Sequence, residues 1–271
     1  MNAPAIRRAF ADLPVGQIHY ASSGAPSAPA VLLLHQSPRS WAEYREVLPI
    51  LGQHFHAIAM DTVGFGDSAP PPWPASIERW AGVAADLLEA LGIGRAHVVG
   101  HHTGGVIAVE LAAAFPGRVA SLVLSSTPYT DAQFRLARAQ RPPIDAVERQ
   151  DDGSHLLQMW RNRQGFYPEG QPRLLEAFVL DALKAAGDIE GGHRAVAGYR
   201  MEERIGRVVQ PALIVRAPLD PFASPHAQEL AARLPQARIV DVEGAMVPLP
   251  DQLPQAFARV VLDFLLAQPV A

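Results

Sequence analysis

The chain has 271 residues, of which 49% are hydrophobic and 18% are charged, so it can bury a sizeable core and is not a disordered chain. Its net charge of −4 offers no basic field to a phosphate backbone, and the lack of cysteine excludes disulfides, thiolate nucleophiles and Cys-ligated zinc. No apolar run reaches the roughly 18–20 residues that cross a bilayer, and the residues after Arg7 and Arg8 do not resemble a secretory signal. We therefore expect a cytoplasmic protein whose partner is a small-molecule substrate, with no nucleic acid and no membrane as a partner.

Short apolar strands alternate with longer helical patterns along most of the chain, which is typical of a mainly parallel sheet with helices on both faces. An antiparallel hairpin is predicted first, over residues 7–21, with its turn at Pro14-Val15-Gly16. The predicted strands that follow span residues 30–34, 55–60, 97–99, 119–124, 212–216 and 237–242. The predicted helices outside the middle of the chain span residues 41–52, 76–91, 105–115, 225–234 and 255–266, with Ser76 as a cap.

The alternation stops between about residues 128 and 209. This stretch shows only amphipathic helical patterns, at residues 145–150, 155–163, 173–186 and 193–204. Because it separates two strands of one sheet, we predict a core of residues 1–127 and 210–271 and a helical lid of residues 128–209 above the carboxyl edge of the sheet. Three lid aromatic residues are the predicted pocket lining: Tyr129, Trp160 and Tyr199.

Four motifs occur in a fixed order along the chain. Gly100–Gly104 joins a predicted strand to a predicted helix and resembles the nucleophile elbow of the α/β-hydrolase fold, G-x-Nuc-x-G. His35–Pro38 resembles the oxyanion loop of that family, and Asp61–Ser68 resembles its D-x-x-G-x-G-x-S loop. Leu213–Pro221 is similar to the strand and loop that deliver the acid of the catalytic triad, which falls on Asp220. The resemblance covers essentially the whole chain and implies the α/β-hydrolase fold with a lid.

The chain departs from the family pattern at its reactive positions. The nucleophile position holds His102, where the family has serine or, less often, aspartate or cysteine. The loop that carries the triad histidine has Ala245 or Met246 at that place, and Gln36 replaces the glycine of the oxyanion loop. Ordinary Ser-His-Asp acyl transfer is therefore not implied.

His102 nevertheless brings a bulky ring that titrates near neutral pH to the base of the expected pocket. The imidazole lost from the last loop and the one gained at the elbow adjoin the same acid, so we predict a catalytic dyad of His102 and Asp220. The resemblance implies that the N–H groups of Ser37 and Thr103 form the oxyanion hole, with His35 supporting the loop.

These residues predict a cofactor-independent enzyme that acts on a small carbonyl compound, and the resemblance implies hydrolysis of an ester, lactone or related bond. A base beside an oxyanion hole also suits a cofactor-free lyase or oxygenase. A pseudo-hydrolase that binds a ligand without turning it over, and a metal-dependent enzyme, are further alternatives. The candidate histidines His35, His101 and His102 have neither H-x-H nor H-E-x-x-H spacing, so no metal site is predicted for them.

Overall fold

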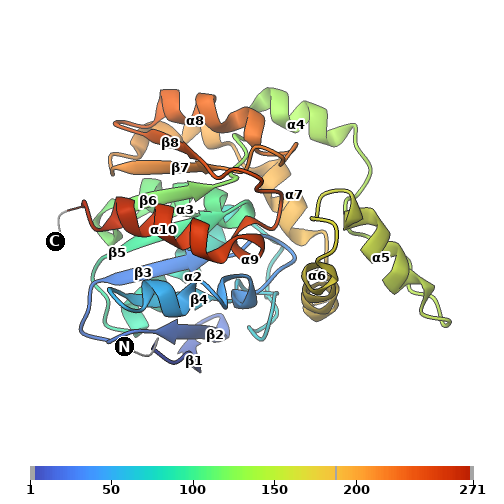
Figure 1. The fold of residues 1–271 in the computed structure, drawn as a ribbon, viewed down its shortest axis with the longest axis horizontal. Helices are drawn as coiled ribbons and strands as arrows, with labels where there is room; N and C mark the ends of the chain where they lie inside the picture. The colour runs from blue at the N-terminus through green and yellow to red at the C-terminus, as the bar shows by residue number, and fades with distance from the viewer. Residues whose placement is uncertain (1–3, 187, 269–271) are drawn as a thin grey trace.

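The computed structural model describes residues 4–186 and 188–268. Its strands form one eight-stranded sheet in the order β1-β2-β4-β3-β5-β6-β7-β8, with the hairpin at one edge (Figure 1). The strands are β1 (Arg7–Leu13), β2 (Gly16–Ser23), β3 (Ala30–Leu34), β4 (His56–Met60), β5 (Ala96–His101), β6 (Val119–Ser125), β7 (Ala212–Arg216) and β8 (Arg238–Asp241). β2 pairs antiparallel with β1 and β4, and the other neighbouring strands are parallel. The predicted hairpin and mainly parallel sheet are thus confirmed.

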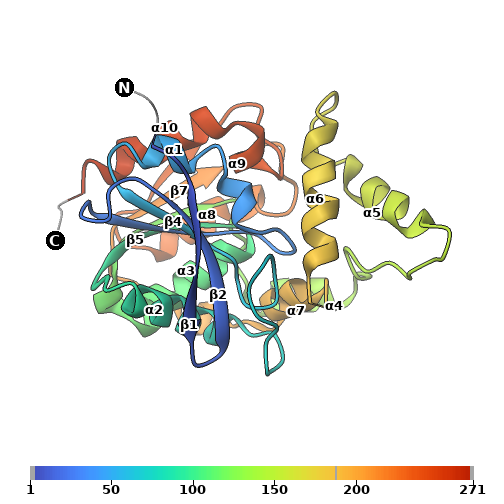
Figure 2. The ribbon, with the colours of Figure 1, turned by 90° about the horizontal axis from the view of Figure 1, so that it is seen from below.

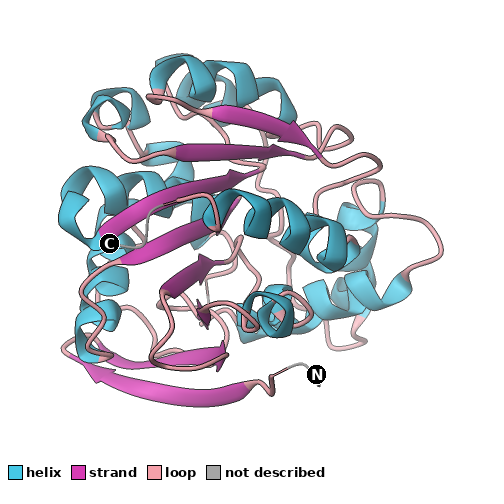
Figure 3. Ribbon diagram, turned by 60° about the vertical axis from the view of Figure 1, so that its left-hand side comes forward, coloured by secondary structure: helices cyan, strands magenta, loops and turns pink. Residues whose placement is uncertain are grey.

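Helices cover both faces of the sheet (Figure 3). One face holds α2 (Ile77–Ala90), α3 (Thr103–Ala114) and α8 (Ala227–Arg233), and the other holds α1 (Leu48–Leu51), α9 (Leu249–Gln252) and α10 (Pro254–Leu265). Successive side chains of a strand point to opposite faces, so in β3 Leu32 and Leu34 join the first core while Val31 and Leu33 join the second. A strand buried on both faces needs a continuous apolar run, which is why the sequence of β3 has no polar alternation.

Two local predictions in the core need correction. The helix expected over residues 41–52 is a 3-10 turn at Trp41–Tyr44 followed by the short α1, which begins anew with a proline in its first turn. Ser76 does precede α2, but its hydroxyl bonds to the Glu78 carboxylate and does not cap the helix. None of the described helices is long and apolar enough to cross a membrane.

Between β6 and β7 the described residues form helices and no strand. The helices are α4 (Ala132–Ala139), α5 (Ser154–Gln164), α6 (Pro172–Lys184) and α7 (Gly191–Gly198), followed by 3-10 turns at Met201–Glu203 and Ile205–Arg207. α5 and α6 lie to one side of the α/β core (Figure 2). We refer to residues 128–209 as the insertion.

Three details of the insertion differ from prediction. Residues 145–150 are not helical, and the N–H groups of Asp145 and Ala146 donate to the side chain of Glu190. α4 was not predicted, although Asp131 caps it by accepting from the Phe134 N–H at 2.7 Å. The last predicted helix ends at Gly198 instead of continuing to residue 204.

Candidate active site

The turn between β5 and α3 presents His102. This residue has φ 46° and ψ −113°, a backbone conformation that residues other than glycine seldom adopt. A side chain at Gly104 would overlap the carbonyl of Leu34, and one at Gly100 would overlap the backbone of Gly104. The two glycines therefore allow the close approach of strand and helix that this elbow requires.

His102 meets Asp220 at the carboxyl edge of the sheet. Its Nε2 lies 2.8 Å from Oδ2 of Asp220, whose side chain is fully buried in the loop after β7. The other carboxylate oxygen accepts hydrogen bonds from the N–H groups of Phe222 at 2.8 Å and Ala223 at 3.3 Å. Burial opposes ionisation of Asp220, but the nearby His102 ring and the Phe222 N–H outweigh burial and lower the pKa of this carboxyl. Asp220 is therefore a carboxylate at neutral pH.

The proton positions on His102 follow from this contact. Asp220 only accepts hydrogen bonds when it is ionised, so Nε2 carries the proton that faces it. The two atoms are close enough for an ion pair, but the carboxylate oxygen lies off the line of the N–H bond, so the hydrogen bond is not fully aligned. Nδ1 makes no hydrogen bond to another described residue and is not one of the buried polar atoms that lack a partner, so it is exposed, and His102 lines the cavity described below. A nitrogen with a free lone pair thus remains accessible on this ring.

His101, the other histidine of the elbow, is buried and neutral. Its Nε2 donates to the carbonyl of Val247 at 2.9 Å, and its Nδ1 accepts from the Ser125 hydroxyl at 2.9 Å. Burial, together with the neighbouring His102 ring, holds the pKa of His101 well below its ordinary value. This side chain therefore ties the elbow to the loop that carries the triad histidine in the resembled family, where Ala245 is fully buried.

His35 holds the oxyanion loop in place. Its Nδ1 donates to the Gln36 carbonyl at 2.8 Å and its Nε2 accepts from the Thr62 N–H at 2.9 Å, which requires a neutral ring. Burial also lowers the pKa of His35. The Gln36 N–H in turn donates to the carboxyl of Glu43 at 2.9 Å. His35 thus acts on the loop and makes no contribution to the cavity lining.

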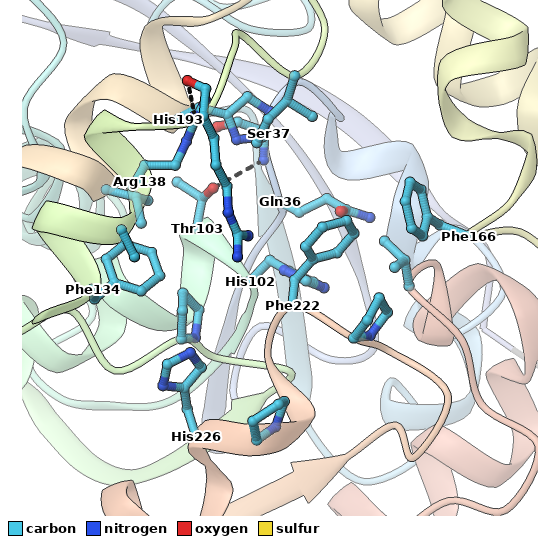
Figure 4. A pocket seen from close by; sticks show the side chains of 18 of the residues that line it. Gln36, Ser37, His102, Thr103, Phe134, Arg138, Phe166, His193, Phe222 and His226 are labelled. Carbon is cyan, nitrogen blue, oxygen red and sulfur yellow. Dashed lines mark hydrogen bonds between the residues drawn. The ribbon is translucent and has the colours of Figure 1, made fainter.

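The structure brings together Ser37 and Thr103, the two predicted oxyanion donors. The Ser37 N–H donates to the Thr103 hydroxyl at 3.3 Å, as the dashed line in Figure 4 shows. Thr103 opens α3, whose N-terminus favours negative charge. The Thr103 hydroxyl therefore occupies the acceptor position at the Ser37 N–H, where an anion would have to replace it.

A cavity of about 880 Å³ lies above the elbow, between the core and the insertion (Figure 4). Its volume is within the range of small-molecule sites. The apolar lining includes Phe134 and Phe166 of the insertion and Phe222 of the loop after β7 that carries Asp220. The polar lining includes His102 and His193. Phe222 stands two positions after Asp220 at the end of a strand, a position that predicts proximity to the site. No spacing in the sequence indicates His193.

The three aromatic residues predicted to line the pocket lie outside this cavity. The Tyr199 hydroxyl donates to the buried Glu110 carboxylate at 2.6 Å. Tyr129 packs beneath the guanidinium of Arg233, at 4.6 Å from its ring centre, and Trp160 lies in a groove between α5 and α6. Helical periodicity identified their apolar faces but not the elements that those faces contact.

Replacing Tyr199 with phenylalanine is therefore expected to lower the free energy of unfolding by about 1–3 kcal/mol, because it removes a buried hydrogen bond to a charged group. Turnover should stay at the wild-type level, since Tyr199 does not reach the cavity. Urea unfolding and a rate assay measure the two quantities. Tyr20→Phe is the matched control, because this ring is half-buried and its hydroxyl makes no hydrogen bond to another described residue. Lost turnover in a stable Tyr199→Phe protein would contradict this placement.

Within residues 4–186 and 188–268, two groups of histidine and carboxylate side chains come close enough to hold a metal ion, and neither includes His102. The groups are His19, Asp61 and Asp67, and Asp145, Glu190 and His193. Each already contains ion pairs, because Arg8 and Lys184 bind Asp67 and Arg163 binds Asp145. A divalent ion would have to displace these cations.

Residues 29–245 match the family model described as alpha/beta hydrolase fold. The bifunctional epoxide hydrolase 2 of Sus scrofa is 34% identical over 116 residues, which cover 42% of this chain and 20% of that protein. The 2-hydroxy-6-oxo-2,4-heptadienoate hydrolase of Pseudomonas putida is 37% identical over 111 residues, which cover 40% of this chain and 39% of that protein. The aligned stretch is therefore less than half of either relative.

A solved structure gives the same fold over nearly the full length. The enol-lactonase of Burkholderia xenovorans LB400 has a TM-score of 0.79 at 23% identity, covering 95% of this chain and 100% of that chain. Three observations indicate the same fold: the strand order, the elbow between β5 and α3, and the extent of the family match. The chain therefore belongs to the alpha/beta hydrolase fold family.

Proposed function

We propose that this protein is a cofactor-independent hydrolase of a small ester, lactone or related carbonyl compound, with His102 as general base and Asp220 as its orienting carboxylate. The observation that carries the proposal is the 2.8 Å contact between these side chains at the cavity. The similarity of this chain to an epoxide hydrolase, a heptadienoate hydrolase and an enol-lactonase supports hydrolysis of a small molecule.

The reaction starts when Nδ1 of His102 takes a proton from a water molecule, whose oxygen then bonds to the carbonyl carbon. Asp220 is a counter-ion to the imidazolium formed in this step and keeps the ring oriented. The negative charge on the former carbonyl oxygen is stabilised by the Thr103 N–H at the start of α3. The Ser37 N–H joins it once the Thr103 hydroxyl rotates away. The bond from carbon to the leaving oxygen then breaks.

The insertion supplies the opposite side of the proposed site. Phe134 lies on α4 and Phe166 follows α5, and both line the cavity that His102 also lines. We infer that residues 128–209 act as a lid that sets which acyl and alcohol groups fit above the elbow. Their apolar rings favour a substrate with a hydrophobic portion.

The decisive experiment is a panel of aryl esters, lactones and β-diketones, assayed under air and under argon in ¹⁸O-labelled water. We expect turnover that does not depend on oxygen and incorporates one labelled oxygen into the acid product. Oxygen-dependent turnover would identify an oxygenase, and cleavage without label would identify a lyase. Tight binding of panel compounds without turnover would support the pseudo-hydrolase.

Serine-directed fluorophosphonates are expected to leave this turnover unchanged, because the elbow has no serine and Ser125, whose hydroxyl donates to His101, is fully buried. Residual activity and peptide mass after incubation give the measurement. A trypsin sample treated in parallel verifies the reagent. Stoichiometric labelling of Ser37, Ser125 or Ser126 together with inactivation would show that a serine and not His102 is the reacting group.

A further inference from the structure

We propose that His193, on α7 of the insertion, is a second catalytic residue that donates a proton to the leaving group. This inference rests on the proposed hydrolysis. His193 lines the same cavity as His102 but comes from the opposite part of the chain. The site would then hold two separate imidazoles, one to take a proton from water and one to give a proton to the departing oxygen.

A buried carboxylate orients the His193 ring. Its Nε2 lies 2.7 Å from Oδ2 of Asp145, whose side chain is 1% exposed. Arg163 binds both oxygens of the same carboxylate, with its Nε at 2.6 Å from Oδ1. Burial opposes ionisation of Asp145, but Arg163 and His193 lower the pKa of this carboxyl to about 2. Asp145 is therefore charged at every pH at which the enzyme would work.

The contacts also determine which nitrogen of His193 is free. Ionised Asp145 only accepts hydrogen bonds, so its short contact with Nε2 requires a proton on that nitrogen. Arg163 also lies near this nitrogen, with its Nη2 at 3.3 Å from Nε2. Because a guanidinium only donates hydrogen bonds, Asp145 is the acceptor for the Nε2 proton. Nδ1 makes no hydrogen bond to another described residue and is not one of the buried polar atoms that lack a partner, so it is exposed and can exchange a proton with a bound molecule. When Nδ1 is protonated, Asp145 is the counter-ion.

The backbone places His193 beside the oxyanion loop. The residue before it, Gly192, packs so closely on Ser37 that a Cβ there would overlap the serine side chain. Figure 4 accordingly shows His193 next to Ser37, whose N–H is one of the proposed oxyanion donors. His193 and the proposed oxyanion donor therefore lie side by side at the wall of the same cavity.

The same side chains do not form a convincing metal site. Glu190, the third member of the group, accepts the backbone N–H groups of Asp145 and Ala146 with one oxygen. Both oxygens of Asp145 are bound by Arg163. An arginine that binds both oxygens of one carboxylate fixes the orientation of that carboxylate and keeps it charged. Asp145 is therefore positioned to bind the imidazole of His193.

The proton transfers balance over one turnover. His102 Nδ1 gains a proton as water adds to the carbonyl carbon, and His193 Nδ1 loses one as the carbon–oxygen bond breaks and the alcohol leaves. The products are the carboxylic acid and the alcohol. The proton on His102 returns to His193 through solvent, so no oxidant or cofactor is required.

Leaving-group dependence tests this role. Two esters with one acyl group are compared, a p-nitrophenyl ester whose phenolate leaves unprotonated and an ethyl ester whose alkoxide needs a proton. His193→Gln should lower kcat/KM for the ethyl ester by about 10²-fold and for the p-nitrophenyl ester by less than about 3-fold. Asp145→Asn should change the ratio of the two rates in the same direction. His155→Gln, the same change on α5 at a residue outside the cavity lining, should leave the ratio at its wild-type value.

The ratio of the two rates does not depend on how much of the variant is folded, because misfolding lowers both rates equally. An unchanged ratio in His193→Gln, with either rate lowered or not, overturns the role of His193 while leaving hydrolysis by His102 intact. Failure of the wild-type protein to hydrolyse either ester instead overturns the proposed function, and this inference with it.

Discussion

Replacing His102 with alanine is expected to lower kcat/KM for the best ester of the panel by about 10³-fold, because it removes the general base. The change also leaves the buried Asp220 carboxylate without the ring that now lies 2.8 Å away. Substrate binding should change much less, since most of the cavity lining is untouched. Steady-state kinetics give kcat/KM, and calorimetric titration with a slow substrate gives the affinity.

Two variants control this result. His54→Ala removes an exposed histidine outside the cavity and should leave turnover unchanged. Asp220→Asn keeps the shape of the acid but removes its charge, and should lower turnover while preserving affinity. Free imidazole added to His102→Ala should restore part of the rate, because the deleted ring leaves room for it. Turnover of His102→Ala within about 3-fold of wild type would contradict a base role worth 10²–10⁴-fold.

Replacing Arg39 with methionine is expected to lower the free energy of unfolding by about 3–5 kcal/mol, because it leaves buried carboxyl groups without their cation. The fully buried guanidinium donates to Asp181 of α6 at 2.8 Å and to Asp251 of α9 at 2.6 Å. Glu43 lies 3.8 Å from it, and burial, only partly offset by Arg39, raises the pKa of Glu43 to about 8. A neutral Glu43 is consistent with one guanidinium that serves three carboxyl groups.

The control for this prediction is Arg200→Met, which breaks an exposed ion pair with Glu203 and should change stability by less than about 0.5 kcal/mol. Urea unfolding followed by circular dichroism measures both variants. Adding Asp181→Asn and Asp251→Asn to Arg39→Met should recover part of the loss, since these changes remove the unpaired charges. We refer to Arg39, Glu43, Asp181 and Asp251 as the Arg39 cluster. Equal stability of Arg39→Met and Arg200→Met would show that this cluster contributes little to the free energy of unfolding.

The cluster also connects stability to the site. Ser40 donates to Asp181 at 2.8 Å, and Glu43 accepts from the Gln36 N–H at 2.9 Å in the oxyanion loop. The oxyanion loop is therefore held by Glu43, which lies next to Arg39, and Arg39 in turn binds Asp181 of α6. Weakening the contacts of Arg39 should for this reason disturb the oxyanion loop at Gln36 before it disturbs the outer helices.

Local signals in the sequence determined the sheet and the elbow. The apolar run of residues 30–34 predicts a strand buried on both faces, and β3 has these bounds. The glycines around His102 predict a tight turn because no side chain fits between that turn and the neighbouring strand. The order of the motifs placed His102 and Asp220 at one edge of a parallel sheet, and the structure brings them to 2.8 Å. These inferences succeed because each depends on a few adjacent residues or on strand ends that share an edge.

Tertiary packing alone decided how the insertion completes the cavity. Tyr129, Trp160 and Tyr199 have the same apolar character as Phe134 and Phe166, yet only the two phenylalanines line the cavity. Amphipathic periodicity states that a helix has a buried face and does not state which element covers that face. The set of Asp145, Arg163 and His193 comes from the loop before α5, from α5 and from α7, which are three separate segments of the insertion. Such contacts arise from the whole packed chain, because no short stretch of sequence holds more than one of the partners.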